Sequence, residues 1–358
     1  MYLIDISSLK NLNDGLNEFI SYCFEYSEKY NEESLKENFS EKLFLDNLAN
    51  EFETEFVPII KKSSVLREHL NTIGNKLEEI CLDYTHQTQN YRNIIIDDSL
   101  INQYEMDSDS KSLFLHLYNT TLDTITFDRY RINKGLETFN EAFGKLKIEV
   151  SICPYCNTNF VSNAYSKDHF LPKKDFPLLA IWVENLVISC KECNEGVKSV
   201  DYKLPCLHPY FDNIEDFFEF RYSRDSNGEI RLEKNVLKTN IEEIATNNFF
   251  DVFKIIERYS NTVLEEAVSN MNDIRREIED NCEMFNVEKK EDIKRIFETK
   301  IHNAILKYQS EKKTRRNTKI FIDFLNQLSE EIDSEVDFLL FKKNLKNRVI
   351  STSNTSHM

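Results

Sequence analysis

The chain has 358 residues, and its 62 acidic and 45 basic side chains give a formal net charge of −17. With only six glycines and six prolines, the composition disfavours a loop-rich β architecture and favours helices. A protein that holds nucleic acid alone usually carries a basic face, so this acidic balance argues against unaided binding over a broad surface.

The chain starts without a basic segment followed by an apolar run, and no apolar stretch approaches the ~20 residues of a membrane-spanning helix. We therefore expect neither a signal peptide nor a membrane span. Four of the eight cysteines form two Cys-x-x-Cys pairs, and the others are scattered: Cys23, Cys81, Cys206 and Cys282. This distribution predicts a cytoplasmic protein with one structural zinc rather than a disulfide framework.

Residues 1–144 are predicted to be a mostly helical N-terminal region. Apolar residues recur at helical spacing over 12–23, 45–56, 73–84 and 136–143. Pro58 predicts a break near the end of the second stretch, and Gly144 predicts the C-terminal cap of the fourth. The apolar run at 94–96 fits either a helix or a strand. We interpret this region, which has no catalytic motif, as a scaffold or docking surface.

Residues 145–212 form the second predicted region, which is marked by two cysteine pairs. Cys153-Pro-Tyr-Cys156 and Cys190-Lys-Glu-Cys193 bracket 33 residues. Each pair can supply two thiolate ligands from one tight turn, and together the pairs complete a four-cysteine zinc site. Because protein fills all four positions, we expect this zinc to stabilise the fold rather than to react.

The segment between the cysteine pairs is expected to contain a few short strands. Val161 and Phe170 fit strands on either side of a turn at 162–165, and residues 181–188 are apolar enough to be buried. Gly196 is expected to open a helix or to lie within one. The predicted fold class is therefore mainly α, with a small zinc-stapled α+β insert between helical regions.

Residues 213–358 are predicted to form a hairpin followed by a helical C-terminal region. Alternating apolar residues over 218–222 and 230–232 flank a turn at 225–228. Helical spacing then returns from residue 240 to 345. Five basic side chains form what we call the basic cluster, which fits either a solvated helix face or a contact with phosphates: Lys312, Lys313, Arg315, Arg316 and Lys319.

The residues between and just after the cysteine pairs suggest phosphodiester cleavage. This reaction needs a divalent cation at the phosphate oxygens and a base that deprotonates water. Asp168 is a hard oxygen ligand suited to magnesium or manganese, and Asn194, which follows the last cysteine, offers a neutral carbonyl oxygen. His169 is the candidate base. Because neighbouring strand residues point to opposite faces, a twist or bulge must bring Asp168 and His169 to one site.

Three short motifs resemble those of the HNH nucleases, which have a ββα-metal fold. They are Asp168-His169-x-x-Pro172, Glu184-Asn185-Leu186, and Cys190-x-x-Cys193-Asn194-x-Gly196-x-Lys198. The resemblance implies that Asp168 and Asn194 hold the catalytic metal and that His169 activates water. It also implies that Asn185 hydrogen-bonds the hairpin and so holds His169 in place.

The same resemblance implies contacts with the phosphate backbone. Lys198 would approach a phosphate, and Lys173 and Lys174, just beyond Pro172, are candidate contacts beside the cut. This chain has asparagine at the last motif position, where many members of the family have histidine. An oxygen ligand there suits a hard metal such as magnesium better than a nitrogen ligand does.

The long helical flanks and the segment His208-Pro-Tyr-Phe-Asp212 resemble the HNH subunits of Septu-type and retron anti-phage systems. In those systems the HNH protein works with an ATPase of the ABC or SMC-like class. The resemblance therefore implies an ATPase partner, which would supply the hold on nucleic acid that an acidic chain lacks.

The sequence thus predicts a metal-dependent HNH endonuclease, with zinc in a structural role and magnesium or manganese in the catalytic one. We expect DNA as the substrate and a role in anti-phage defence or restriction. One alternative is a catalytically inactive, zinc-stapled binding or scaffold subunit. Another is an HNH nuclease that cleaves RNA, because a ββα-metal site grips phosphates rather than reading bases.

Overall fold

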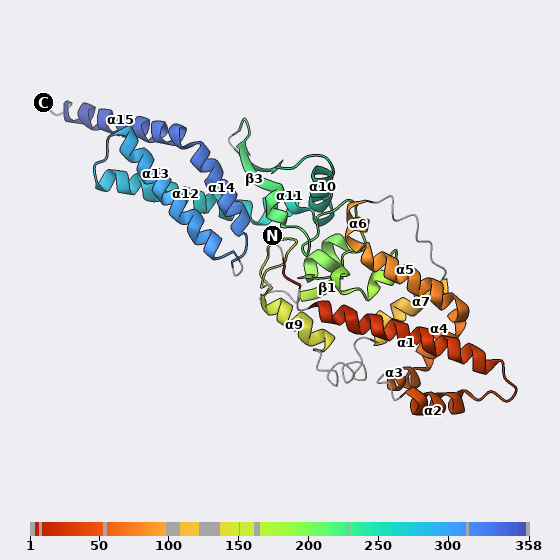
Figure 1. The fold of residues 1–358 in the computed structure, drawn as a ribbon. Helices are drawn as coiled ribbons and strands as arrows, with labels where there is room; N and C mark the ends of the chain where they lie inside the picture. The colour runs from red at the N-terminus through yellow and green to blue at the C-terminus, as the bar shows by residue number, and fades with distance from the viewer. Residues whose placement is uncertain are drawn as a thin grey trace. The chain divides into compact units, whose positions relative to one another are not determined.

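The computed structural model describes residues 4–6, 9–52, 56–97, 108–121, 137–149, 151–160, 165–227, 229–312 and 315–355. Within these residues the protein is mainly helical and contains two small antiparallel sheets of two strands each (Figure 1). This arrangement confirms the predicted mainly α class with a small α+β part.

The chain packs as two compact units. Unit 1 comprises residues 1–156, 160–214 and 239–253, and unit 2 comprises residues 157–159, 215–238 and 254–358. Unit 1 therefore joins the N-terminal helices to the four-cysteine segment. The change of unit after residue 214 lies close to the expected boundary after residue 212, and the division into three regions stays a prediction.

Unit 1 is built around α1 (Lys10–Ser34), a long helix with one buried apolar face. Leu12, Leu16, Phe19 and Cys23 recur every three or four residues and are all buried. This face packs α1 against α4 (Ser64–Ile73) and α5 (Leu77–Gln89), which lie beside it in Figure 1. The helix predicted over 12–23 is confirmed and is longer than expected.

The remaining α-helices described in unit 1 are shorter. They are α2 (Glu41–Phe52), α3 (Val57–Lys62), α6 (Tyr91–Ile96), α7 (Ser108–His116), α9 (Phe139–Glu149) and α10 (Ile241–Phe253). Pro58 lies in the first turn of α3, where its missing N–H is tolerated, so the predicted break is confirmed.

Gly74 and Gly144 take different places relative to the ends of helices. Gly74 has φ = 49°, a left-handed conformation that ends α4 and separates it from α5, so the helix predicted over 73–84 is present as α5 but begins at Leu77. Gly144 lies inside α9 instead of capping a helix. The helix continues because Leu146 extends its apolar face and is fully buried.

The sheet of unit 1 pairs β1 (Tyr165–His169) with β2 (Leu186–Cys190) in an antiparallel register. Asp168 stands opposite Val187, and His169 stands opposite Leu186. Tyr165 therefore begins a strand and does not belong to a turn, while the strand expected at Val161 falls outside the described residues. Every residue of β2 is buried, as the apolar run had predicted.

Short helical turns surround this sheet. They are η4 (Leu117–Thr121), η5 (Pro177–Ala180), η6 (Val183–Asn185) and η7 (Glu192–Lys198), and a further turn, η2 (Gly74–Lys76), precedes α5. Gly196 lies within η7, as expected. Both α5 and α7 pack against η5, and α10 packs against η7. The N-terminal helices therefore support the strand that carries the candidate site.

Unit 2 combines a hairpin with a helical bundle. The hairpin is confirmed: β3 (Phe218–Arg224) follows η8 (Ile214–Phe217) and pairs with β4 (Ile230–Val236). The helices are α11 (Ile255–Thr262), α12 (Leu264–Met284), α13 (Lys290–Ser310), α14 (Thr318–Glu330) and α15 (Ile332–Thr355). The buried face of α14 packs against β3 and α13. Among the described residues, no helix has both the length and the apolar character needed to cross a membrane.

Candidate functional site

The four cysteines of the two pairs meet in unit 1. The Sγ atoms of Cys153, Cys156, Cys190 and Cys193 all lie within 4.8 Å of one another, and all four side chains are buried. The Sγ atoms of Cys156 and Cys190 are 3.6 Å apart. Tetrahedral zinc with bonds of about 2.3 Å places its sulfurs about 3.8 Å apart, so these cysteines can hold a zinc ion.

The backbone around the cysteines supports thiolate ligands. The Cys193 N–H lies 3.4 Å from the Cys190 Sγ, and the Cys190 N–H lies 3.3 Å from the Cys153 Sγ. Burial raises the pKa of the Cys153 thiol well above its usual range, so an isolated thiolate there is unfavourable. A bound zinc ion would supply the positive charge that keeps such a buried cluster deprotonated.

Asp168 lies in a buried polar cluster on β1. Its side chain is 1% exposed, its Oδ2 accepts a hydrogen bond from the Tyr155 hydroxyl at 2.8 Å, and its Oδ1 lies 2.9 Å from the Lys198 Nζ. Lys198, which is 2% exposed, also donates to the His169 carbonyl oxygen at 2.7 Å. Lys198 therefore neutralises Asp168 inside the protein, and its expected place beside a bound phosphate is not what the structure shows.

Asn194 lies on the same side of β1 as Asp168. Its Nδ2 donates to the Ser166 Oγ at 3.0 Å, and Ser166 precedes Asp168 by two residues, so their side chains share one strand face. Asn194 lies in η7, which begins one residue before Cys193, so the last cysteine and Asn194 are held by the same helical turn. The two expected metal ligands thus come from different elements to one face of the sheet.

His169 ends β1, and its ring is enclosed by η4 and η5. Its Nε2 lies 3.1 Å from the Ala180 carbonyl oxygen, and its ring centroid lies 4.4 Å from that of Tyr118. A carbonyl oxygen can only accept a hydrogen bond, so Nε2 carries the proton and Nδ1 retains the lone pair. Burial lowers the pKa of His169 to about 3, which keeps the ring neutral near pH 7.

Asn185 clasps the two segments that flank His169. Its Oδ1 accepts from the Leu171 N–H at 2.8 Å, and its Nδ2 donates to the Leu171 and Leu179 carbonyl oxygens, both at 3.0 Å. Leu171 follows His169 by two residues, and Leu179 precedes Ala180, the partner of the His169 ring. These contacts agree with the expectation that Asn185 holds His169 in place.

Buried hydrogen-bonding groups connect His208 through Tyr91 to Asn185. The Tyr210 N–H donates to the Nδ1 of His208 at 3.1 Å, so the His208 Nε2 carries the proton and faces the Tyr91 hydroxyl at 3.3 Å. Tyr91 in turn donates to the Asn185 Oδ1 at 2.8 Å. Burial lowers the pKa of His208 well below its usual range, so the ring is neutral and serves this network as a donor and an acceptor.

Sequence reasoning did not identify Tyr91, Tyr118 or Tyr155 as parts of this site. Tyr91 and Tyr118 come from helices far earlier in the chain and carry no motif that marks them. Tyr155 lies inside the first cysteine pair, and this position was the one available signal that it could reach the site.

The expected phosphate-contacting lysines differ in their surroundings. Lys174 is exposed, whereas Lys173 is half-buried, lies 4.7 Å from the centre of the Tyr118 ring, and donates to the Asn119 Oδ1 at 3.0 Å. Burial lowers the pKa of Lys173. Both lysines follow β1 directly, so they lie near His169 in the chain.

The basic cluster of unit 2 is largely neutralised by acidic side chains. Lys312 pairs with Glu215, Arg315 with Glu311 at 2.8 Å, and Arg316 with Glu266 at 3.6 Å. Lys319 is buried and lies 2.8 Å from Asp323. Lys313 lies outside the described residues, and each of the other four basic side chains faces a carboxylate. For Lys319, which is buried, the alternative of a solvated helix face is wrong.

Comparisons with known proteins give limited information. No family model matches the chain, and no solved structure matches it. Over 64 residues the chain is 38% identical to "Protein ea31" of Escherichia phage lambda. This stretch is 17% of the chain and spans about a fifth (21%) of the length of the phage protein.

Proposed function

We propose that the protein is a metal-dependent endonuclease of the HNH type, with His169 as the base that deprotonates the attacking water. The observation that carries this proposal is the orientation of the His169 ring. Its Nε2 is engaged by the Ala180 carbonyl oxygen at 3.1 Å, so the unprotonated nitrogen is Nδ1. Asn185 fixes both segments around the ring, which is the support that a general base requires.

In this proposal Asp168 and Asn194 hold the catalytic magnesium or manganese ion. The carboxylate has about four lone-pair positions, of which Tyr155 and Lys198 use two, so the donor set is compatible with a hard cation. When bound, such an ion stabilises the negative charge on the departing 3′ oxygen. Lys198 would orient Asp168 through their contact at 2.9 Å, and the products would carry a 5′ phosphate and a 3′ hydroxyl.

The acidic charge supports a partner in this activity. The net charge is −17, and described residues of the basic cluster are paired with acidic side chains. We therefore propose an ATPase subunit that holds the nucleic acid while this chain cuts it, in anti-phage defence or restriction. DNA is the favoured substrate, and RNA is the alternative that the experiment below also tests.

A second candidate function is a binding or scaffold subunit without activity. It is favoured by the burial of Asp168, whose two oxygens each accept a hydrogen bond, from Tyr155 and Lys198, while the side chain is 1% exposed. If that carboxylate is purely structural, the cysteine cluster would serve only to shape a surface.

The test is nicking of supercoiled plasmid DNA, with a matched RNA substrate, by the full chain in the presence of magnesium or manganese. Wild type is compared with His169→Ala and with His302→Ala, which removes an exposed histidine of unit 2. We expect His169→Ala to lose at least about 100-fold in rate, as removal of a general base does, and His302→Ala to cut normally.

If wild type and His169→Ala cut at equal rates, the assigned base is wrong. If wild type binds zinc but cuts neither DNA nor RNA, alone or with an ATPase partner, the scaffold function is supported instead.

A further inference from the structure

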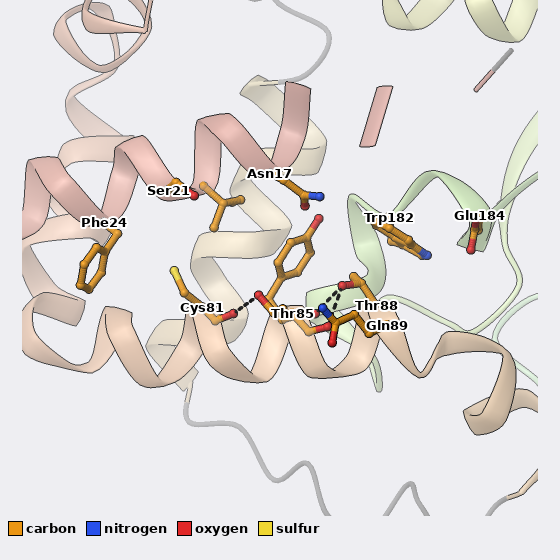
Figure 2. Close-up of a pocket in the computed structure, with 11 residues that line it drawn as sticks. Asn17, Ser21, Phe24, Cys81, Thr85, Thr88, Gln89, Trp182 and Glu184 are labelled. Atoms are coloured by element: carbon orange, nitrogen blue, oxygen red, sulfur yellow. Dashed lines mark hydrogen bonds between the residues drawn. The ribbon is translucent and has the colours of Figure 1, made fainter. Parts of the chain in front are cut away.

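Unit 1 contains a pocket of about 670 Å³ between α1, α5 and the segment that leads into β2 (Figure 2). This volume lies within the roughly 300–1,000 Å³ of typical small-molecule sites. Asn17 and Phe24 reach it from α1, Cys81 reaches it from α5, and Trp182 and Glu184 close one end. The pocket is separate from the cysteines and from Asp168 and Asn194, none of which lines it.

Two buried hydrogen-bond donors in the lining lack a partner. The hydroxyl of Tyr84 and the indole Nε1 of Trp182 are both buried and make no hydrogen bond, and the Tyr84 side chain is 2% exposed. Such unsatisfied groups are uncommon because each costs free energy unless a ligand or water satisfies it. Burial also raises the pKa of Tyr84, so its hydroxyl stays protonated and can donate.

The two threonine hydroxyls in the lining are engaged by carbonyl oxygens of α5. The Thr85 Oγ1 donates to the Cys81 carbonyl oxygen at 2.8 Å, and the Thr88 Oγ1 donates to the Tyr84 carbonyl oxygen at 2.8 Å (Figure 2). By contrast, the Tyr84 hydroxyl and the Trp182 Nε1 are donors of the lining that no described group satisfies. Their rings meet edge-on, with centroids 6.4 Å apart, and so offer an aromatic wall beside the two donors.

The charge of the lining restricts the class of ligand. Glu184 contributes a carboxylate, and no lysine, arginine or histidine lines the pocket. A phosphate or carboxylate ligand would meet Glu184 without a compensating cation, which is unfavourable in a partly buried site. Aromatic rings, two donors and the Asn17 amide suit instead an uncharged heteroaromatic ring with carbonyl or ring-nitrogen acceptors.

We propose that this pocket binds an uncharged nucleobase-like ligand, a nucleoside or free base, through hydrogen bonds from Tyr84 and Trp182. The ligand stacks on the aromatic wall while its acceptors satisfy the two donors. This site is independent of the proposed nuclease function, because none of the residues assigned to cleavage forms it.

The experiment is titration of the full chain with adenosine, guanosine, cytidine and uridine, each compared with its 5′-monophosphate. Trp182 is the one tryptophan of the sequence, so a change in tryptophan fluorescence reports this pocket directly, and calorimetry gives the Kd. We expect saturable binding of at least one nucleoside and binding of its monophosphate at least about tenfold weaker.

Matched variants locate the binding. Tyr84→Phe keeps the ring and removes the donor, so its Kd should rise about fivefold, which is typical of one lost neutral hydrogen bond. Tyr26→Phe removes the hydroxyl of a buried α1 tyrosine outside the pocket and should leave the Kd unchanged. The proposal is overturned if no nucleoside binds the folded wild type, if Tyr84→Phe binds as wild type does, or if the monophosphates bind equally well.

Discussion

An ion pair on β1 of unit 1 and an ion pair on the helices of unit 2 differ in how far they are buried. In unit 1, Asp168 and Lys198 form an ion pair in which the side chains are 1% and 2% exposed. In unit 2, pairs such as Lys294 with Asp333, at 2.8 Å, have side chains that are 40% and 70% exposed. Exposed pairs contribute about 0–1 kcal/mol each, whereas a buried pair loses most of its attraction to desolvation.

This difference indicates what each arrangement is for. Ion pairs on the surface of a helix lose little hydration when they form. In unit 2 such pairs neutralise Arg315 and Arg316 of the basic cluster. A buried ion pair adds little net free energy of folding, because apolar residues of similar volume often give the same stability or more. Unit 2 also holds a buried pair, Lys319 with Asp323, so what distinguishes the pair on β1 is its position beside His169 and Asn194.

The largest effect is expected when one of the four cysteines that can hold zinc in unit 1 is replaced. Structural zinc in small peptides contributes about 10–16 kcal/mol of apparent binding free energy, so Cys193→Ser should abolish tight zinc binding and unfold the segment around β1 and β2. Zinc content after dialysis and limited proteolysis measure both effects. Cys282→Ser, which changes a cysteine of α12, is the control and should retain zinc. Retention of one equivalent by Cys193→Ser would contradict the site.

The next effect compares the two kinds of ion pair directly. Lys198→Met leaves Asp168 buried without its cationic partner, so the free energy of unfolding of unit 1 should fall by about 3–5 kcal/mol. Lys294→Met opens an exposed pair of unit 2 and should cost less than about 1 kcal/mol. Urea unfolding gives the free energy of unfolding of both variants. Equal losses would contradict the expected difference between a buried and an exposed ion pair.

Asn185→Ala tests the clasp around His169. The change leaves buried partners of Asn185 without hydrogen bonds, so we expect a loss of about 3 kcal/mol in the free energy of unfolding. Asn281→Ala removes one exposed contact to the Glu277 carbonyl oxygen in unit 2 and should cost less than about 1 kcal/mol. Similar urea midpoints for the two variants would count against a clasp.

The smallest effect is a dependence of unit 1 stability on pH. Burial holds the pKa of His208 well below the unfolded value of about 6.5, so the stabilisation of the neutral ring is present above that pH and is lost as the pH falls below it. The expected loss is about 1.4 kcal/mol for the first unit below pH 6.5. His208→Asn should show a shallower decline in urea midpoint, and an unchanged slope would contradict the assignment.

Local features of the fold could be predicted from the sequence. The cysteine pairs, the break at Pro58 and the hairpin of unit 2 depend on residues close together in the chain, so spacing and turn chemistry were sufficient. Gly144 shows the limit of such reasoning, because the buried contact of Leu146 outweighs the tendency of glycine to end a helix.

The partners within the candidate site could not be predicted in this way. Asp168 and Lys198 are 30 residues apart, and the Tyr91 that supports Asn185 lies 94 residues before it. A lysine in a motif is usually solvated, and only the packing of η7 against β1 and β2 shows that Lys198 is buried. The roles of the site residues in cleavage stay predictions.

The central claim is that the polar cluster on β1 serves cleavage rather than stability. The most direct test is the triple variant Tyr155→Phe, Asp168→Leu and Lys198→Met, which replaces the cluster with apolar groups and leaves no buried charge unpaired. We expect the variant to bind zinc and to unfold within about 2 kcal/mol of wild type, yet to lose magnesium-dependent nicking. A folded variant that nicks DNA at the wild-type rate would contradict the claim.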